Sequence, residues 1–325
     1  MKIFSGIQPS GNIHIGNYLA VIKQWVALQE KADCIFCIVD WHAITVPYEV
    51  KTLQQKIKEV ASIYLTSGIN PEKSIIFVQS QVKEHSELAW LLNTITPFGD
   101  LQRMTQFKDK SKKLQGNVNA GLFNYPVLMA GDILLYQTDV VPVGEDQKQH
   151  VELARTIAKK FNSKFGETFK IPEVSVLKIG AKIMSLTEPS KKMSKSDPES
   201  SRIGIFDTPE QIKKKIGSAT TDSGKEVKFN PKEKPGISNL LVIYSLFSDR
   251  PIKDIEKEFI GQSYQKFKQS LTDLLITKLE PLKNKKDELD KSPELIEKIL
   301  ADGALRAEKQ AKETMQKVKT SMGLS

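Results

Sequence analysis

Apolar residues in the first hundred positions of the chain fall into short runs, separated by longer stretches in which apolar and polar positions mix. The short runs, each of strand length, are Ile3–Ile7, Cys34–Val39 and Ile75–Gln79. The mixed stretches, which have helical spacing, are about Asn17–Lys31, Glu49–Ser67 and Glu84–Thr94. Strands that alternate with helices predict a parallel sheet with right-handed crossovers. Ligands of such sheets bind at the carboxyl ends of the strands, so we expect functional residues directly after Ile7 and Val39.

The rest of the chain is richer in helix signals. Helices are expected at Gly121–Thr138 and Gln147–Phe161, followed by a strand at Val174–Lys178. From Thr208 onward the pattern is almost wholly helical, and it ends in an amphipathic helix at Leu305–Met322. The candidate N-caps are Thr208, Ser292 and Ser238, the last before a helix at Asn239–Phe247.

These patterns predict two domains in the 325 residues. Residues 1–200 are expected to form a Rossmann-like α/β domain with a parallel sheet, into which a connecting region at about 97–155 is inserted. Residues 201–325 are expected to form an all-helical domain, and the last helix is expected to pack back on the first domain.

Charge changes this picture little. The chain carries 48 Lys and Arg against 39 Asp and Glu, a net charge of +9, and the densest basic segment is 103–113. A polyanion such as tRNA would fit that segment, because Lys and Arg supply most non-specific affinity for phosphates. A lysine-rich surface that keeps the protein soluble explains the segment as well, and charge alone favours this second interpretation.

The sequence gives no sign of a membrane segment. No run of 18 or more apolar residues occurs, and the first residues lack the basic and apolar regions of a signal peptide. We therefore expect a cytoplasmic protein without a membrane partner. Cys34 and Cys37 lie three apart on an expected strand and face opposite sides, so we interpret them as core residues that form neither a disulfide nor a metal site.

The turn after the first strand has the composition of a nucleotide site. Gln8, Pro9, Ser10 and Gly11 would let adenine and ribose approach the backbone, and a Cβ at Gly16 would crowd the nucleotide. His14 and Asn17 offer donors to phosphate oxygens near the start of the next helix, where the helix dipole also favours negative charge. The alternative is an ordinary capped junction between strand and helix.

A lysine-rich loop far along the chain supplies the second half of such a site. Its residues are Lys192, Met193, Ser194, Lys195 and Ser196. A mobile loop with two lysines three apart can bring both ammonium groups to a leaving pyrophosphate. Lys110 and Lys191 are further candidates for phosphate contacts, and the alternative is a solvated basic loop. The chain has neither a dinucleotide-binding glycine fingerprint nor a P-loop.

Together the two segments resemble the H-x-G-H and K-M-S-K-S elements of the class I aminoacyl-tRNA synthetases. Other segments are similar to the bacterial tryptophanyl-tRNA synthetases, namely 6–11, 40–45, 126–134, 143–150, 191–198 and 234–239. The resemblance covers essentially the whole chain. Asn17 stands where the general class pattern has a second His, and its amide can still donate to a phosphate.

The resemblance implies a reaction and its partners. Tryptophan and ATP would give tryptophanyl-adenylate, and the acyl group would then pass to the terminal adenosine of tRNA(Trp). Mg²⁺ would accompany ATP, held mostly by phosphates and water, with no organic cofactor and no protein metal site. The family works as a homodimer with its interface near the inserted region, and the helical domain would bind the anticodon.

The same resemblance assigns residues to the substrates. Asp132 would accept the indole N–H, and Met129 would pack on the ring. Phe4, His42, Val141 and Val143 would line the pocket, while Tyr125 and Gln147, alongside Gln8, would bind the ammonium and carboxylate groups of tryptophan. On ATP, Gly144, Glu145 and Asp146 would contact the ribose, and the backbone of Ile183 would contact adenine.

Four other interpretations fit part of the sequence. A tyrosyl-tRNA synthetase shares the fold, but it would be expected to use a Tyr/Asp pair on the phenol. A small nucleotidyltransferase would not need the helical half of the chain. A catalytically idle RNA-binding paralogue would not need to keep His14, Lys192, Lys195 and Asp132, and a structural interaction protein leaves these spacings unexplained.

Overall fold

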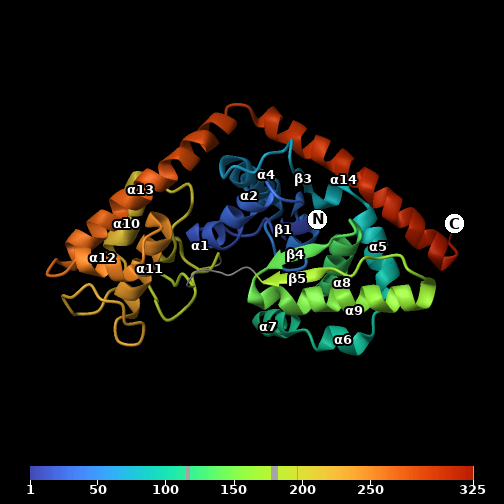
Figure 1. Ribbon diagram of the computed structural model, residues 1–325, viewed down its shortest axis with the longest axis horizontal. Coiled ribbons are helices and arrows are strands. Elements are labelled where there is room, and N and C mark those ends of the chain that lie inside the picture. The colour runs from blue at the N-terminus through green and yellow to red at the C-terminus, as the bar shows by residue number, and fades with distance from the viewer. Residues whose placement is uncertain (115–117, 177–181, 196, 325) are drawn as a thin grey trace. The chain divides into compact units, whose positions relative to one another are not determined.

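Five short parallel strands form the sheet at the centre of one part of the structure (Figure 1). The computed structural model describes residues 1–114, 118–176, 182–195 and 197–324. Within it the chain divides into two compact units. The first unit consists of Met1–Ser10, Trp25–Leu177 and Pro293–Ser325, and the second of Gly11–Gln24 and Lys178–Ser292. Both units are discontinuous in sequence, and the division expected at residue 200 stays a prediction.

The sheet of the first unit has the strand order β3-β2-β1-β4-β5, and all neighbouring pairs are parallel. The strands are β1 Lys2–Ile7, β2 Asp33–Ile38, β3 Ile75–Val78, β4 Val140–Val143 and β5 Glu173–Val176. The order reverses between β1 and β4, and ligands of open α/β sheets bind at such a reversal. The parallel sheet and the helical remainder confirm the predicted Rossmann-like α/β fold with a helical part.

Helices cover both faces of this sheet (Figure 1). On one face, Phe36 of β2 stacks on Trp25 of α2 (Lys23–Leu28), with 4.8 Å between ring centroids, and meets Tyr64 of α4 (Val50–Thr66) edge-on. On the other face, Phe4, Ile35 and Phe77 join a large apolar core. This core also takes residues from α5 (Glu84–Asn93), α8 (Ala120–Leu134), α9 (Lys148–Phe165) and α14 (Pro293–Met322).

Helix α14 packs against the edge strand β3 and against α4 and α5. The approach is close at Gly303, where a Cβ would stand 1.8 Å from the carbonyl oxygen of Ile76. Only glycine fits at this point, since any side chain would overlap the backbone of β3. The helix begins at Pro293, well before the expected Leu305.

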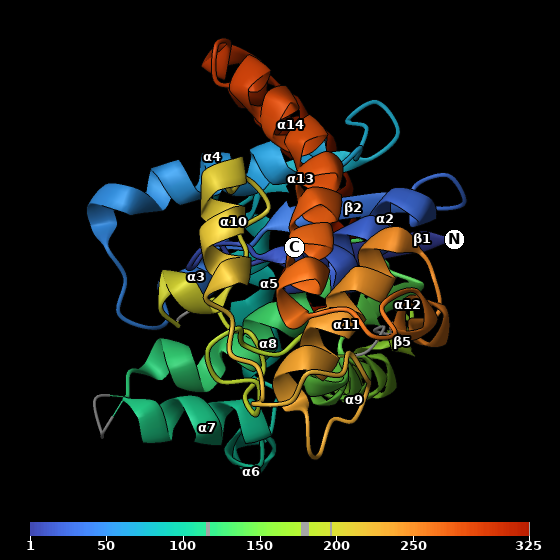
Figure 2. The same cartoon turned by 90° about the vertical axis from the view of Figure 1, so that its left-hand side faces the viewer.

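The second unit is mainly helical (Figure 2). Its helices are α1 (Ile15–Asn17), the π-helix η1 (Tyr18–Ile22), α10 (Pro209–Gly217), α11 (Pro235–Ser248), α12 (Ile252–Glu258) and α13 (Tyr264–Leu289). Helix α13 packs against α10 and α11, where Phe267 stacks on Tyr244 with 5.8 Å between centroids. Thr208 caps α10 as predicted, because its hydroxyl accepts from the N–H of Gln211.

Several expected elements differ from the structure. Strand β4 was not expected, and the helix expected at Asn17–Lys31 is divided among α1, η1 and α2. Ser238 does not cap a helix, because α11 begins three residues earlier at Pro235 and includes it. The remaining elements are short connections or caps: α3 (Asp40–Ala43), η2 (Gln79–Gln81), α6 (Phe98–Gln102), α7 (Thr105–Lys113), η3 (Glu145–Gln147) and η4 (Glu199–Ser201).

Two predictions about chemistry can be compared with this fold. Cys34 and Cys37 are both buried and unpaired, which confirms their interpretation as core residues. Among the described helices, none is long and apolar enough to cross a membrane.

Candidate functional site

Polar side chains gather at the carboxyl edge of the sheet in the first unit. Gln8, Pro9 and Ser10 follow β1, α3 follows β2, η2 follows β3, and Gly144 follows β4. The strands are parallel, so all these segments lie at one edge. Gln8 is tied to this edge because its side-chain amide donates to the backbone carbonyl of His42.

Asp132 is the centre of the polar cluster at this edge. It lies near the end of α8 and is 1% exposed. Its Oδ2 is 2.7 Å from Nε2 of His42, and its Oδ1 is 2.7 Å from Nε2 of Gln79 and 2.6 Å from Nδ1 of His85. Three donors from three different elements therefore meet on one carboxylate.

The hydrogen-bond donors around Asp132 determine whether its carboxyl group is ionised. Burial alone would raise the pKa of this carboxyl, but hydrogen bonds from His42 and His85 lower it, and the resulting pKa is about 2. Asp132 is thus an ionised carboxylate although it is almost fully buried. Such a group accepts hydrogen bonds strongly and leaves a ligand without a matching donor at a disadvantage.

The apolar residues predicted to line the indole pocket belong to the core of the same unit. Phe4, Val141 and Val143 belong to the buried core of the unit, and Met129 packs against that core. Tyr125 of α8 meets His42 edge-on, with 6.1 Å between ring centroids. The sequence-predicted indole residues of α3, α8, β1 and β4 are therefore all placed in one unit.

Tyr125 connects this group to a second buried histidine. Its hydroxyl is 2.9 Å from Nε2 of His150 on α9, and the ammonium of Lys110 on α7 lies 4.3 Å from its ring centroid. Burial raises the pKa of Tyr125, so the hydroxyl keeps its proton. Burial, followed by the charge of Lys110, lowers the pKa of His150 to about 4. Lys110 therefore lies beside an aromatic ring and a neutral imidazole.

The segment after β4 is partly exposed at this edge. Gly144 precedes η3, in which Glu145 and Asp146 are exposed and Gln147 is half-buried. The Gln147 amide donates to Asp146 Oδ2 over 2.8 Å. Exposed carboxylates at the start of a helix turn can accept hydrogen bonds from the hydroxyls of a sugar.

His14, Gly16 and Asn17 form a compact cap in the second unit. His14 is the N-cap of α1, and its Nδ1 accepts the N–H of Gly16 over 3.1 Å, while Asn17 Oδ1 accepts the N–H of His14 over 3.3 Å. Burial, followed by the charges of Lys195, Arg202 and Lys192, lowers the pKa of His14 to about 3. The neutral ring accepts at Nδ1, so its proton is on Nε2, which is a donor.

The lysine loop is anchored to the segment before it. Lys192 pairs with Met184 in an antiparallel bridge, and the N–H of Met193 donates to the carbonyl of Ile183 over 3.1 Å. Met193 is buried, whereas Lys192 is exposed and Lys195 is half-buried. Lys195 also lies against Gly11, where a Cβ would be 2.7 Å from the Lys195 Cβ. Ser194 is half-buried, and Ser196 lies outside the described residues.

The structure thus brings together residues far apart in sequence within each unit. Asp132, Met129, His42 and the strand residues belong to the first unit, with Gln8–Ser10 and 144–147. The residues His14, Gly16, Asn17, Ile183 and 192–195 belong to the second. Within the described residues, His, Cys, Asp and Glu side chains nowhere gather in a group of three or more that could hold a metal ion.

Sequence reasoning missed several residues of these clusters, namely Gln79, His85, Tyr136, His150 and Arg202. One signal could have indicated two of them. The chain has only four histidines, and all four are buried, with His85 fully so and His150 1% exposed. A scarce, polar residue type that is always buried points to a structured polar site.

Comparison with known proteins gives consistent matches over the whole chain. The family model described as "tRNA synthetases class I (W and Y)" matches residues 1–280. A tryptophan--tRNA ligase of Caldanaerobacter subterraneus subsp. tengcongensis is 52% identical over 324 residues, which is 99% of this chain and 98% of that protein. The tryptophan--tRNA ligase of Bacillus subtilis is 49% identical over 323 residues, covering 99% and 97%.

Solved structures give the same result. The tryptophanyl-tRNA synthetase of Campylobacter jejuni, complexed with ADP and tryptophan, matches with a TM-score of 0.88 and 40% identity over 100% of both chains. The tryptophanyl-tRNA synthetase of Mycoplasma pneumoniae matches with a TM-score of 0.88 and 36% identity, covering 100% of this chain and 98% of that one.

Proposed function

The chain belongs to the class I tRNA synthetases of the tryptophan and tyrosine family, and we propose that it is an ATP-dependent tryptophan--tRNA ligase. A carboxylate oxygen of tryptophan attacks the α-phosphorus of ATP, and pyrophosphate leaves. A hydroxyl of the terminal adenosine of tRNA(Trp) then attacks the acyl carbon, and AMP leaves. The positions and charges of side chains supply the rate enhancement, because the protein forms no covalent bond in either step.

The observation that carries the choice of tryptophan is the ionised, buried Asp132. Its carboxylate accepts the single indole N–H, and neighbouring side chains hold the rings. These are the apolar residues Met129, Phe4, Val141 and Val143, together with the imidazole of His42. Tyr125 and Gln147 bind the ammonium and carboxylate groups of the substrate. Tyrosine carries its donor O–H on a single ring, at a position different from that of the indole N–H, so a site arranged for indole leaves its own acceptor poorly matched.

ATP is bound by the residues of the two nucleotide motifs. The Nε2–H of neutral His14 and the amide of Asn17 donate to phosphate oxygens, and Lys192 and Lys195 stabilise the charge that develops on the leaving pyrophosphate. Gly144, Glu145 and Asp146 contact the ribose. The remaining contacts come from Gln8, Pro9, Ser10, Gly16, Ile183, Met193, Ser194 and Ser196. Mg²⁺ accompanies ATP and is held by phosphates and water.

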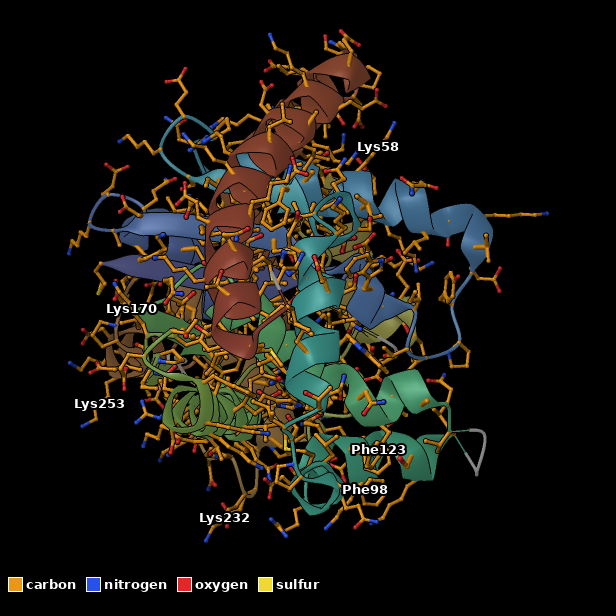
Figure 3. All side chains as sticks on the ribbon, turned by 90° about the vertical axis from the view of Figure 1, so that its right-hand side faces the viewer. Lys58, Phe98, Phe123, Lys170, Lys232 and Lys253 are labelled. Atoms are coloured by element: carbon orange, nitrogen blue, oxygen red, sulfur yellow. The ribbon has the colours of Figure 1, made fainter. Side chains whose placement is uncertain are left out.

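A second copy of the chain is the proposed partner of an exposed apolar groove in the first unit. A cavity of about 410 Å³ is lined by Ile44, Trp90, Leu128 and their neighbours, and Trp90 is 71% exposed. Phe98 of α6 is 64% exposed and lies beside Phe123 of α8 (Figure 3), with the two rings tilted and their centroids 4.8 Å apart. Exposed aromatic residues in such numbers are typical of protein interfaces. The groove adjoins the region 97–155, where the homodimer interface is expected.

The test of the function is ATP–pyrophosphate exchange with each of the twenty amino acids. The assay contains Mg²⁺ and a buffer with the pH and salt concentration of the cytoplasm. Tryptophan is expected to drive exchange, and the same amino acid is expected to be transferred to tRNA(Trp). The helical second unit is proposed to contact the anticodon, so anticodon changes should weaken transfer and leave exchange unaltered. Exchange driven by tyrosine, or by no amino acid, would contradict the proposal.

A further inference from the structure

A line of buried polar side chains continues behind Asp132, on the side away from His42. Nδ1 of His85 is 2.6 Å from Asp132 Oδ1, and Nε2 of the same ring is 2.7 Å from the hydroxyl of Tyr136. Both His85 and Tyr136 are fully buried. Phe77 holds the two rings apart from solvent, with centroids 5.7 Å from His85 and 6.0 Å from Tyr136.

The hydrogen bonds in this line have one direction. The ionised Asp132 can only accept, so Nδ1 of His85 carries a proton. When the imidazole carries only this proton, Nε2 is an acceptor, and the Tyr136 hydroxyl donates to it. Burial, followed by the charges nearby, raises the pKa of Tyr136 well above its ordinary value, so this hydroxyl keeps its proton. Tyr136 therefore selects the tautomer of His85 that donates to Asp132.

The donors also decide which carboxylate oxygen is available to a ligand. Oδ1 accepts from both His85 and Gln79, and the Gln79 amide is itself oriented because its Oε1 accepts the N–H of Trp41 over 3.2 Å. Of the three donors to this carboxylate, only His42 is bound to Oδ2. An oxygen of an ionised carboxylate accepts about two hydrogen bonds, so Oδ2 retains the capacity to accept one more.

We propose that His85, supported by Tyr136, is a positioning residue for substrate selection. It fixes the plane of Asp132 and keeps the carboxylate ionised, so that Oδ2 is presented to the indole N–H. The inference rests on the proposed function, because it takes tryptophan as the ligand of Asp132. His85 does not touch the substrate in this arrangement and acts only through Asp132.

Loss of His85 has a specific chemical consequence. Without its donor, the buried carboxylate would lose a charge-assisted hydrogen bond and bind a proton at higher pH. A protonated Asp132 presents an O–H where the indole presents an N–H, and two donors repel each other. The loss of affinity would therefore affect ligands that carry the N–H, and it would increase as the pH falls.

The test compares His85→Leu with His85→Asn. The amide of Asn places an N–H near the position of Nδ1 and keeps the donor to Asp132, whereas Leu removes it. Two quantities are measured by pyrophosphate exchange: the KM for tryptophan, and the inhibition constant of the benzothiophene analogue of tryptophan, in which sulfur replaces the N–H. His85→Leu should raise the KM about tenfold or more and change the inhibition constant less than about twofold, as for one lost hydrogen bond to a charged group.

Two further variants complete the experiment. His85→Asn should recover most of the affinity for tryptophan, and Tyr136→Phe should weaken tryptophan selectively but by a smaller factor, because the His85 tautomer is then less restricted. The KM of His85→Leu should also begin to rise as the pH falls below about 5, while that of the unaltered chain stays flat, because the loss of one charge-assisted hydrogen bond raises the pKa of the Asp132 carboxyl by about one to two. If His85→Leu does not fold, Tyr136→Phe and His85→Asn carry the comparison.

The outcomes separate the two proposals. Equal weakening of tryptophan and of the benzothiophene analogue would make His85 merely structural and overturn the inference. The inference is also overturned if Tyr136→Phe shows no selective loss and His85→Asn does no better than His85→Leu. An unaltered chain that fails to activate tryptophan would instead overturn the proposed function itself.

Discussion

Burial acts in the same direction on Asp132 and His14, against the charged form, but the two residues respond differently. At Asp132, hydrogen bonds from His42 and His85 outweigh burial, so its pKa is about 2 and the carboxylate is ionised. His14 has cations for neighbours, so its pKa falls to about 3 and the imidazole is neutral. One residue is thus prepared to accept a hydrogen bond and the other to donate one.

The first residue-scale prediction concerns Asp132→Asn. The amide cannot provide two acceptor oxygens to its three donors, so tryptophan loses its partner. We expect kcat/KM for tryptophan in pyrophosphate exchange to fall about 10- to 100-fold, which corresponds to about 1–3 kcal/mol for a buried hydrogen bond. Asp139→Asn is the matched control, because this carboxylate pairs with Lys170. If kcat/KM for tryptophan is unchanged in Asp132→Asn, Asp132 does not belong to the substrate site.

The second residue-scale prediction concerns pH. The folded pKa of His14 lies below that of an unfolded histidine, so between the two values the unfolded state binds more protons and stability falls as the pH falls. From about pH 7 to pH 5, this residue should cost about 2 kcal/mol of unfolding free energy. His14→Asn keeps a capping acceptor without titrating, so its urea unfolding should lose less stability over the same range. Parallel losses in both proteins would contradict this.

The amount of the site that can be predicted from sequence differs by residue. Asp132 and His14 can be identified because they stand in recognisable motifs. His85 and Gln79 cannot, since each reaches Asp132 from a separate element, 47 and 53 positions away along the chain. Only the parallel sheet and the packing of α5 on α8 bring them together.

At the scale of elements, periodicity predicted the long helices and four of the five described strands, β1, β2, β3 and β5. It missed β4, which has four residues and contains Pro142, a residue that is unfavourable within a strand. It also missed the π-helix at Tyr18–Ile22, because a change in helical winding leaves no mark in the apolar spacing. Ser238 resembles a cap in sequence, yet Pro235 is the residue at which the helix begins.

The prediction for the helix α14 concerns Gly303→Ala. A methyl group here would overlap the carbonyl of Ile76, so α14 must move from β3. We expect a loss of about 2 kcal/mol in unfolding free energy, more than any gain in helix propensity, from the overpacking of a close contact. Gly217→Ala at the end of α10 is the control, because nothing lies within 4 Å of its added Cβ. Equal stabilities by urea unfolding would refute the close contact.

The prediction for the lysine loop concerns Lys195→Ala. The ammonium of Lys195 is proposed to stabilise charge that develops as pyrophosphate leaves, so its loss should lower kcat of exchange about 100-fold with little change in the KM for tryptophan. Lys257→Ala is the control, because Lys257 is exposed on α12 and pairs with Asp254 at 3.2 Å. We expect Lys257→Ala to change kcat less than about threefold. A rise in KM alone would make Lys195 a binding residue.

At the scale of the molecule, the Rossmann-like sheet and the helical remainder could be predicted, because alternation of strands and helices is a strong signal. Which segments of the chain belong to which of the two units could not be predicted. Residues 11–24 leave the first unit directly after β1, and α14 returns to it after the whole helical segment. Such exchanges depend on long-range packing, which a local pattern does not record.

The whole-molecule prediction concerns the proposed dimer. Trp90→Glu places a charge in the exposed groove, and burying it against a second copy would be costly. Sedimentation velocity should show a dimer for the unaltered chain and mainly monomer for the variant at the same concentration. Leu305→Glu is the control, since Leu305 is 66% exposed on α14 outside this groove and should leave the dimer intact. A monomeric unaltered chain would rule out the homodimer.

The return of α14 to the first unit has a consequence for biosynthesis. During translation, β3 and the exposed backbone of Ile76 emerge long before α14, and the whole of residues 178–292 is made between them. The β3 edge of the sheet therefore stays uncovered while the rest of the chain is synthesised. An uncovered edge strand is prone to pair with other chains. A nascent chain halted after α13 should accordingly bind chaperones more than one released after α14.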